Sequence, residues 1–124
     1  MNVQDLHAPY YLITGGTPLH GEVVISGAKN AVTKMMMASL LTTEPCTLRN
    51  VPLSGELDLT MRLCQDIGSQ MILEDHTLSI CTPAIDKTTI STQVGGLNRV
   101  AVMTLGPLLH RCGEIMIPRP GGDR

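Results

Sequence analysis

The stretch that decides the fold is ISGAKNAVTKMMMASLL, residues 25–41, in which a β-branched run passes into a helical pattern. Between residues 28 and 41 apolar side chains occupy nearly every side, and Ala, Met and Leu all favour helix. A helix that is apolar almost all round is a buried helix. We therefore expect a central helix here, in which the run from Met35 to Met37 fills the core.

Two short β-like runs precede this helix. Residues 10–14, YYLIT, end at a pair of glycines, and residues 22–26 are rich in β-branched side chains. The intervening Gly-Gly-Thr-Pro is a turn signal. We expect two strands around that turn.

The residues after the helix predict a strand, a second helix and a hairpin. Residues 46–51 are typical of a strand, and residues 52–55 of a turn. The second helix is expected to be amphipathic. Ser54 is its N-terminal cap, Glu56 and Asp58 form its acidic first turn, and Gly68 ends it. Its apolar stripe is Leu59, Leu63 and Ile67. Residues 69–82 hold two apolar runs around the polar tip Glu74-Asp75-His76, which predicts a hairpin.

A third helical pattern occupies residues 97–112, after a polar connection with room for one short strand. It is again apolar nearly all round, and Gly106-Pro107 should kink or divide it. Residues 114–118 then predict a strand. A shift of 69 residues superposes the first helical segment on this one, pairing Gly27 with Gly96, Asn30 with Arg99, Leu40 with Leu109 and Leu48 with Ile117. We therefore expect an internal repeat in an α+β fold.

The composition points to one soluble domain or less. The chain has 124 residues, 43% of them apolar, with a formal charge of -2 and a pI near 6.0. Without an electropositive field it is not expected to bind nucleic acid. No apolar run approaches the roughly 20 residues of a membrane span, and the N-terminus lacks a signal-peptide pattern, so we expect a cytoplasmic protein. The four cysteines are widely spaced, which favours reduced structural thiols and no metal site.

Lys29 and Asn30 stand where the predicted strand gives way to the central helix. Free backbone N–H groups and the helix dipole favour anions at such a junction, and a lysine adds a full charge. The pair is therefore either a phosphate or carboxylate subsite or an ordinary helix start with a solvated lysine. Arg99 lies at the matching start of the next helix, and it needs either a structural carboxylate or an anionic ligand.

Asp123 follows two glycines in the closing stretch PGGDR, residues 120–124. Glycines let a loop move and approach a ligand, and a carboxyl group in a closed loop can act as a general acid. On the pattern alone, however, an aspartate in an ordinary turn is the commoner case.

Four stretches together resemble the N-terminal part of the UDP-N-acetylglucosamine enolpyruvyl transferases, the MurA family. They are LHGEVVISGAKNA (19–31), LRNVP (48–52), LTMRLCQDIGSQM (59–71) and TLGPLLHRCGEIMIPRPGGD (104–123). The sister transferases of the shikimate pathway share the architecture but differ at the opening motif. The resemblance implies transfer of the enolpyruvyl group of phosphoenolpyruvate to the 3'-hydroxyl of UDP-N-acetylglucosamine in peptidoglycan synthesis, and we expect no cofactor.

The resemblance also implies a fold of two similar domains, each built from three β-α-β-α-β-β units around buried helices, an inside-out α/β barrel. Residues 1–25 would join the other domain, and residues 26–124 would be an incomplete first domain. Its first unit would span about residues 22–82, and a partial second unit residues 83–124. We accordingly expect the N-terminal fragment of a longer enzyme, inactive by itself.

Carried over by position, Lys29 contacts the phosphate of phosphoenolpyruvate, Asn30 helps hold the substrates and Arg99 binds the nucleotide sugar. Asp123 takes the place of a cysteine that in many members donates a proton to the methylene carbon of phosphoenolpyruvate. The resemblance implies that Asp123 donates this proton and that the intact enzyme resists the epoxide fosfomycin, because a carboxyl group is a poor target for alkylation. The alternative is a non-catalytic module derived from the family that binds anions weakly or self-associates.

Overall fold

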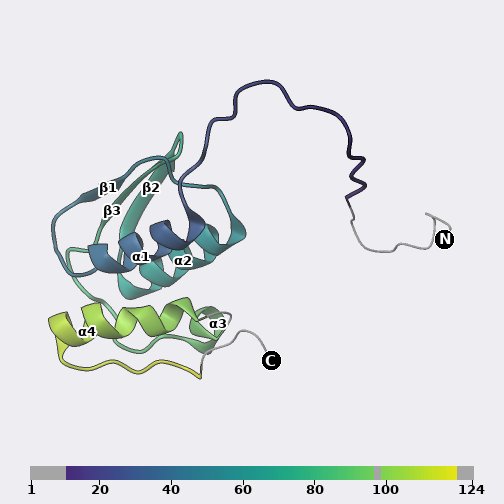
Figure 1. The fold of residues 1–124 in the computed structure, drawn as a ribbon. Coiled ribbons are helices and arrows are strands. Elements are labelled where there is room, and N and C mark those ends of the chain that lie inside the picture. Colours follow the sequence, from purple (N-terminus) through teal and green to yellow (C-terminus); the bar gives the residue numbers. More distant parts are fainter. Residues whose placement is uncertain (1–10, 97–98, 120–124) are drawn as a thin grey trace.

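The computed structural model describes residues 11–96 and 99–119, which form a small sheet covered by helices (Figure 1). In chain order the elements are α1 (Lys29–Ser39), β1 (Cys46–Leu48), α2 (Gly55–Ile67), β2 (Gln70–Glu74), β3 (Thr77–Cys81), α3 (Thr92–Gly95), the 3-10 helix η2 (Val100–Thr104) and α4 (Leu105–Cys112). Helices α1 and α2 lie side by side against the sheet, and η2 and α4 lie alongside α1. The α+β class expected from the sequence is confirmed.

The sheet has the order β1-β3-β2, and both strand pairs are antiparallel. Strands β2 and β3 form the predicted hairpin, whose two-residue turn is Asp75 and His76. Both turn residues have positive φ, 42° and 60°, which is the left-handed geometry that the tightest hairpin turns require. Leu78 and Ile80 share one face of β3 and are buried. The sheet therefore contributes one apolar face to the core.

Helix α1 lies within the helix predicted at residues 28–41. Its inner face buries Val32, Met36 and Met37, and Leu40 is buried just beyond its last turn. The expected burial on every side is wrong for this chain, since Met35 is 53% exposed. The sheet, α2 and η2 cover only part of the circumference of α1. Some apolar side chains of this helix are therefore left exposed to solvent.

Helix α2 begins and ends where the sequence predicts. The Ser54 side chain accepts a hydrogen bond of 3.3 Å from the Leu57 backbone N–H, and Gly68 ends the helix with a φ of 124°. Of the predicted stripe, Leu63 and Ile67 are fully buried, but Leu59 is only half-buried, and Leu57, outside that stripe, is fully buried. Local capping signals were sufficient to place this helix.

The cysteines are free thiols in different surroundings. Cys64 lies in the core beside the stripe of α2, whereas Cys112 is exposed at the end of α4. Burial raises the pKa of the Cys64 thiol to about 12, which suppresses the reactive thiolate. Cys64 is therefore a packing residue.

Two predictions of strands near the ends of the chain are wrong for this structure. Residues 11–26 contain no strand and are exposed throughout, Val24 by 97%. Residues 114–118 contribute only a single parallel bridge, between Thr89 and Met116. A β-like sequence forms a strand only beside a hydrogen-bonding partner, and residues 11–24 lead away from the described sheet (Figure 1).

The third helical pattern is divided as expected, but at a different place. The 3-10 helix η2 ends at Thr104 and α4 begins at Leu105. Pro107 then falls in the first turn of α4, where its missing N–H removes no intrahelical hydrogen bond. The Gly-Pro pair therefore helps to start a helix and does not break one.

The two segments of the predicted repeat differ in backbone pairing and in burial. The Gly27 N–H donates to the Asn50 carbonyl at 3.1 Å, whereas in the second segment the Ile90 N–H donates to the Met116 carbonyl at 2.9 Å, which is out of register with the 69-residue shift. Leu40 is fully buried, while its partner in the superposition, Leu109, is 47% exposed. The second segment begins as a 3-10 helix, which changes the faces that its later residues present.

Arg111, in the last turn of α4, ties three segments together. Its Nη1 donates to the carbonyl oxygens of Leu40 at 3.1 Å and Thr82 at 2.9 Å, and its Nη2 to that of Pro83 at 3.2 Å. A third Nη1 contact reaches the Thr42 carbonyl at 3.5 Å. The guanidinium thus satisfies carbonyls at the C-terminal end of α1, where a cation is also favoured by the helix dipole.

We predict that Arg111→Lys destabilises the fold by about 1.5–3 kcal/mol, because a single ammonium cannot bond to the carbonyls of both separated backbone segments, residues 40–42 and 82–83. Urea unfolding followed by circular dichroism measures this change. The matched control is Arg62→Lys on the exposed side of α2, which should stay within about 0.5 kcal/mol of the parent. Equal unfolding midpoints for the two variants would contradict the role given to Arg111.

Candidate functional site

The candidate site begins at the N-terminal end of α1. Ala28 precedes the helix in extended conformation, and no side chain of the described residues caps it. The carbonyl of Ala28 accepts the N–H groups of Ala31 and Val32, and the first turn contains no acidic residue. The positive end of this helix dipole is therefore left for some other negative group to compensate.

Gly27 sets the direction in which the chain enters α1. Its N–H donates to the Asn50 carbonyl, and a Cβ at this position would overlap the same carbonyl oxygen. A glycine is required here by close backbone approach. Asn50 adds a second contact by donating from Nδ2 to the Ile25 carbonyl at 3.4 Å.

The hairpin tip bonds to Val51, the residue that follows Asn50. The Val51 N–H donates to the His76 carbonyl at 2.7 Å, and the Val51 carbonyl lies 2.8 Å from Nδ1 of His76. His76 is thus bonded to Val51 through both its backbone and its ring. The tip of the hairpin, the loop after β1 and the start of α1 form one connected set of hydrogen bonds.

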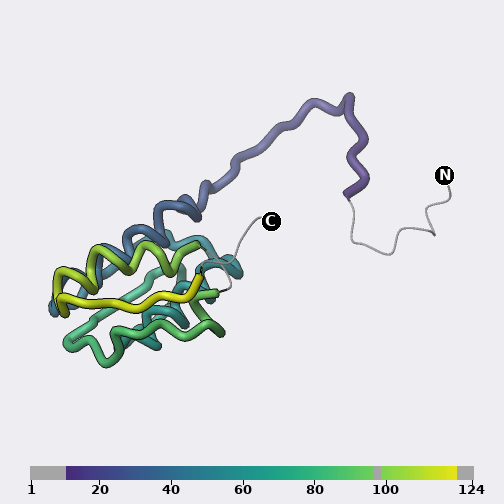
Figure 2. Tube along the Cα trace, turned by 90° about the horizontal axis from the view of Figure 1, so that it is seen from below, coloured from purple at the N-terminus to yellow at the C-terminus, as the bar shows by residue number. Residues whose placement is uncertain are grey.

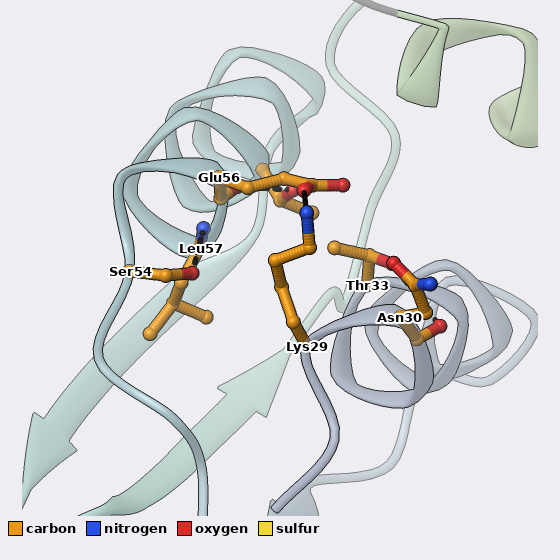
Figure 3. Close-up of polar contacts among 7 residues, drawn as sticks. Lys29, Asn30, Thr33, Ser54, Glu56 and Leu57 are labelled. Atoms are coloured by element: carbon orange, nitrogen blue, oxygen red, sulfur yellow. Dashed lines mark hydrogen bonds and ion pairs between the residues drawn. The ribbon is translucent and has the colours of Figure 1, made fainter. Parts of the chain in front are cut away.

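Lys29, the first residue of α1, reaches across to α2. Its Nζ lies 2.8 Å from Oε2 of Glu56, in the first turn of α2, and the two side chains are 56% and 29% exposed (Figure 3). Asn30 is exposed in the first turn of α1, and its carbonyl accepts a hydrogen bond from the hydroxyl of Thr33. Lys29 is therefore paired with a carboxylate of this chain, and it is not the fully solvated lysine of an ordinary helix start.

Arg99 is exposed and directly precedes η2. Figures 1 and 2 show that η2 and α4 run beside α1 in the same direction. The segments that carry Lys29, Asn30 and Arg99 therefore begin at the same end of the helical layer. The shared end of these segments is what the structure shows of the predicted site.

Asp123 lies outside the described residues. The segment before it, from Glu114 to Arg119, returns from the end of α4 towards the end at which η2 begins (Figure 1). Pro118 lies against α3, where a Cβ on Gly95 would stand 2.9 Å from its ring. The last described residues are thus anchored beside the start of the second helical segment.

A small, largely apolar hollow lies beside the start of α1. It measures about 90 Å³ and is lined by Gly27 and Ala28 before α1, by Ala31, Val32 and Met35 of α1, and by residues 48–52. Ligand pockets usually measure about 300–1,000 Å³. This hollow is therefore smaller than an ordinary ligand pocket.

Two further features of the described ranges bear on the class of site. Within residues 11–96 and 99–119, no three His, Cys, Asp or Glu side chains gather as a metal ion would need. In the same ranges no helix has the length and apolar character to cross a bilayer.

Comparison with known proteins identifies the fold first. The chain matches the crystal structure of the enolpyruvyl transferase NikO from Streptomyces tendae with a TM-score of 0.70, at 22% identity, over 80% of this chain and 23% of that one. The α1-β1-α2-β2-β3 arrangement thus belongs to the enolpyruvyl transferase fold that the resemblance predicts. The charged helix starts lie on a scaffold of that class.

The sequence comparisons agree. The model of EPSP synthase (3-phosphoshikimate 1-carboxyvinyltransferase) matches residues 13–124, so the chain belongs to the EPSP synthase family. Three relatives are named UDP-N-acetylglucosamine 1-carboxyvinyltransferase: that of Chlamydia pneumoniae is 45% identical, that of Chlamydia abortus 42% and that of Borreliella burgdorferi 35%. They are matched over 85%, 90% and 91% of this chain. The chain spans only 24–26% of their length.

We predict that Gly27→Ala displaces the Asn50 carbonyl and costs about 1–3 kcal/mol, the usual penalty of forcing an extra carbon into packed structure. The backbone amide signals of Lys29 and Asn30 should shift in the nuclear magnetic resonance spectrum. Gly55→Ala is the control, because a Cβ there meets nothing within 4 Å. An unfolding midpoint for Gly27→Ala as high as that of Gly55→Ala would refute the close approach.

Proposed function

We propose that the chain forms part of a UDP-N-acetylglucosamine 1-carboxyvinyltransferase. That enzyme would transfer the enolpyruvyl group of phosphoenolpyruvate to the 3'-hydroxyl of UDP-N-acetylglucosamine and release phosphate. The main support is the 45% identity to a relative of that name, over a stretch that includes Lys29 at an uncapped helix start. Residues 1–25 would add strands to a second domain, and residues 26–124 would belong to the first.

The phosphate of phosphoenolpyruvate is assigned to the start of α1. Backbone N–H groups and the ammonium of Lys29 supply positive charge there, and Asn30 offers an amide beside them. Arg99, at the start of the parallel helical segment, is assigned to the nucleotide sugar. A guanidinium is well suited to the paired oxygens of a diphosphate.

Asp123 is the proposed proton donor. Its carboxylic acid gives a proton to the methylene carbon of phosphoenolpyruvate while the sugar hydroxyl adds to the neighbouring carbon and loses its own proton. In the second step that neighbouring carbon expels phosphate and the new methyl group loses a proton, which restores the double bond. A carboxyl group can serve if the closed site raises its pKa, since exclusion of water favours the neutral form.

The assignment carries several consequences for the whole enzyme. It places the protein in the cytoplasm and in peptidoglycan synthesis, and therefore in cell-wall biogenesis, cell shape and cell division. The chemistry uses no cofactor, nucleic acid or membrane. An aspartate at the loop position makes the enzyme insensitive to fosfomycin, whose epoxide alkylates a thiolate.

We predict that Asp123→Ala, in a protein of the relatives' length that carries this chain, lowers turnover by about 10²–10⁴-fold, the usual contribution of a general acid. Asp123→Cys should keep activity and become inactivated by fosfomycin with time. Phosphate release measured with both substrates tests both variants. Glu44→Gln, an exposed carboxylate beyond α1, is the control and should change neither property. Unchanged turnover in Asp123→Ala would remove the aspartate from the mechanism.

A second function is favoured by the exposed apolar residues on this chain alone. Large apolar side chains of residues 11–25 and Met35 lie open to solvent, as in a surface that another protein covers. The 124 residues by themselves would then be an anion-binding or self-associating module without catalysis.

We predict that the 124-residue chain releases no phosphate from the two substrates above background and sediments as more than a monomer. Calorimetric titration with UDP-N-acetylglucosamine tests whether the nucleotide sugar still binds at millimolar concentration. Measurable turnover by the chain would overturn the expected inactivity, whereas sedimentation as a clean monomer would overturn self-association.

A further inference from the structure

The ion pair between Lys29 and Glu56 joins the starts of two helices. Each partner is held by its own element, because Lys29 opens α1 and Glu56 lies in the first turn of α2. The first turn of α2 is fixed by the Ser54 cap and by the hydroxyl of Thr60, which donates to the Glu56 carbonyl at 2.7 Å. The carboxylate therefore approaches Lys29 from a fixed backbone position.

The second ion pair of α2 shows what is particular about this one. Lys87 lies 2.7 Å from Asp66, with side-chain exposures of 58% and 22% that resemble those of the first pair. Asp66 belongs to the last turn of α2, and the hydrogen bond and charge of Asp66 raise the pKa of Lys87. That pair only fastens a loop to a helix, whereas the Lys29 pair lies at an uncapped helix start.

A lysine at the positive end of a helix adds charge where charge is already positive. The Glu56 carboxylate compensates both the ammonium of Lys29 and the N-terminal end of α2, and it lies 2.8 Å from Nζ. A phosphate oxygen bound to the same ammonium would take the same distance, since both are charge-assisted hydrogen bonds. Glu56 thus engages one of the three N–H donors of the ammonium that a phosphate at the start of α1 would use.

We propose that Glu56 is the resident counter-ion of Lys29, and that a phosphate group binds at the start of α1 by displacing it. This inference rests on the proposed function, in which Lys29 receives the phosphate of phosphoenolpyruvate. Glu56 then sets the affinity of the subsite by competition. It discriminates against weak, singly charged anions, because only an anion that interacts more strongly than a carboxylate takes its place.

The expected effect follows from the charge alone. In Glu56→Gln the carboxylate that competes with phosphate for the Lys29 ammonium is removed, and so is its repulsion of the bound phosphate. Affinity for phosphate should rise by roughly three- to tenfold, the size expected for one unit charge a few ångströms away in a solvent-exposed site. Lys29→Gln should abolish the same binding.

The test uses the 124-residue chain, with inorganic phosphate and phosphoenolpyruvate as probes at fixed ionic strength. Binding is followed through the backbone amide signals of Lys29 and Asn30. Asp66→Asn is the matched control, because it changes the net charge by the same amount and breaks the other ion pair of α2. Thermal unfolding of each variant verifies that it is folded.

Tighter binding in Glu56→Gln, unchanged binding in Asp66→Asn and loss of binding in Lys29→Gln support the exchange. Binding that depends on Lys29 but is unchanged or weaker in Glu56→Gln overturns the inference and leaves the proposed phosphate subsite standing. An equal gain in Asp66→Asn also overturns it, because the effect would then be one of net charge. If neither the parent nor Glu56→Gln binds either probe, the phosphate subsite itself fails, and the inference with it.

Discussion

The arrangement of the helices depends on the guanidinium of Arg111. By bonding to carbonyls after α1 and after β3, it places the C-terminal end of α4 at the C-terminal end of α1. Since η2 and α4 continue in one direction, the start of η2 must then lie at the end where α1 starts. The position of two helix starts at one end of the helical layer is thus linked to a contact at the opposite end.

The site end is organised by backbone geometry more than by side chains. Gly27 has no room for a side chain, Asn50 is in the left-handed region with a φ of 56°, and Val51 is bonded twice to His76. These contacts set the direction of the first turn of α1 independently of its charged side chains. The ion pair of Lys29 and Glu56 then joins the aligned helix to its neighbour.

Features with a local cause could be predicted from the sequence, and those with a distant cause could not. The Ser54 cap, the Gly68 terminus and the hairpin are each specified within a few residues. The strands expected in residues 10–14, 22–26 and 114–118 have the right composition, but pairing is decided by segments elsewhere.

The candidate site divides in the same way. Lys29 and Asn30 could be singled out from the helix start that follows Gly27, but the carboxylate opposite Lys29 comes from another helix and gave no signal at that spacing. Arg111 was missed because its acceptors are backbone carbonyls, which every residue has. The role of Asp123 rests on family resemblance, since neither its own pattern nor the described geometry assigns one.

At the hairpin tip, two structural requirements act on the same residue, His76. Glycine at position 76 would suit the left-handed turn better than histidine does, yet it would remove the ring that meets the Val51 carbonyl. Selection for the turn alone and selection for the helix start favour different residues at this one position. The residue at the tip of a hairpin thus helps to fix the loop that positions the start of α1, almost fifty residues earlier in the chain.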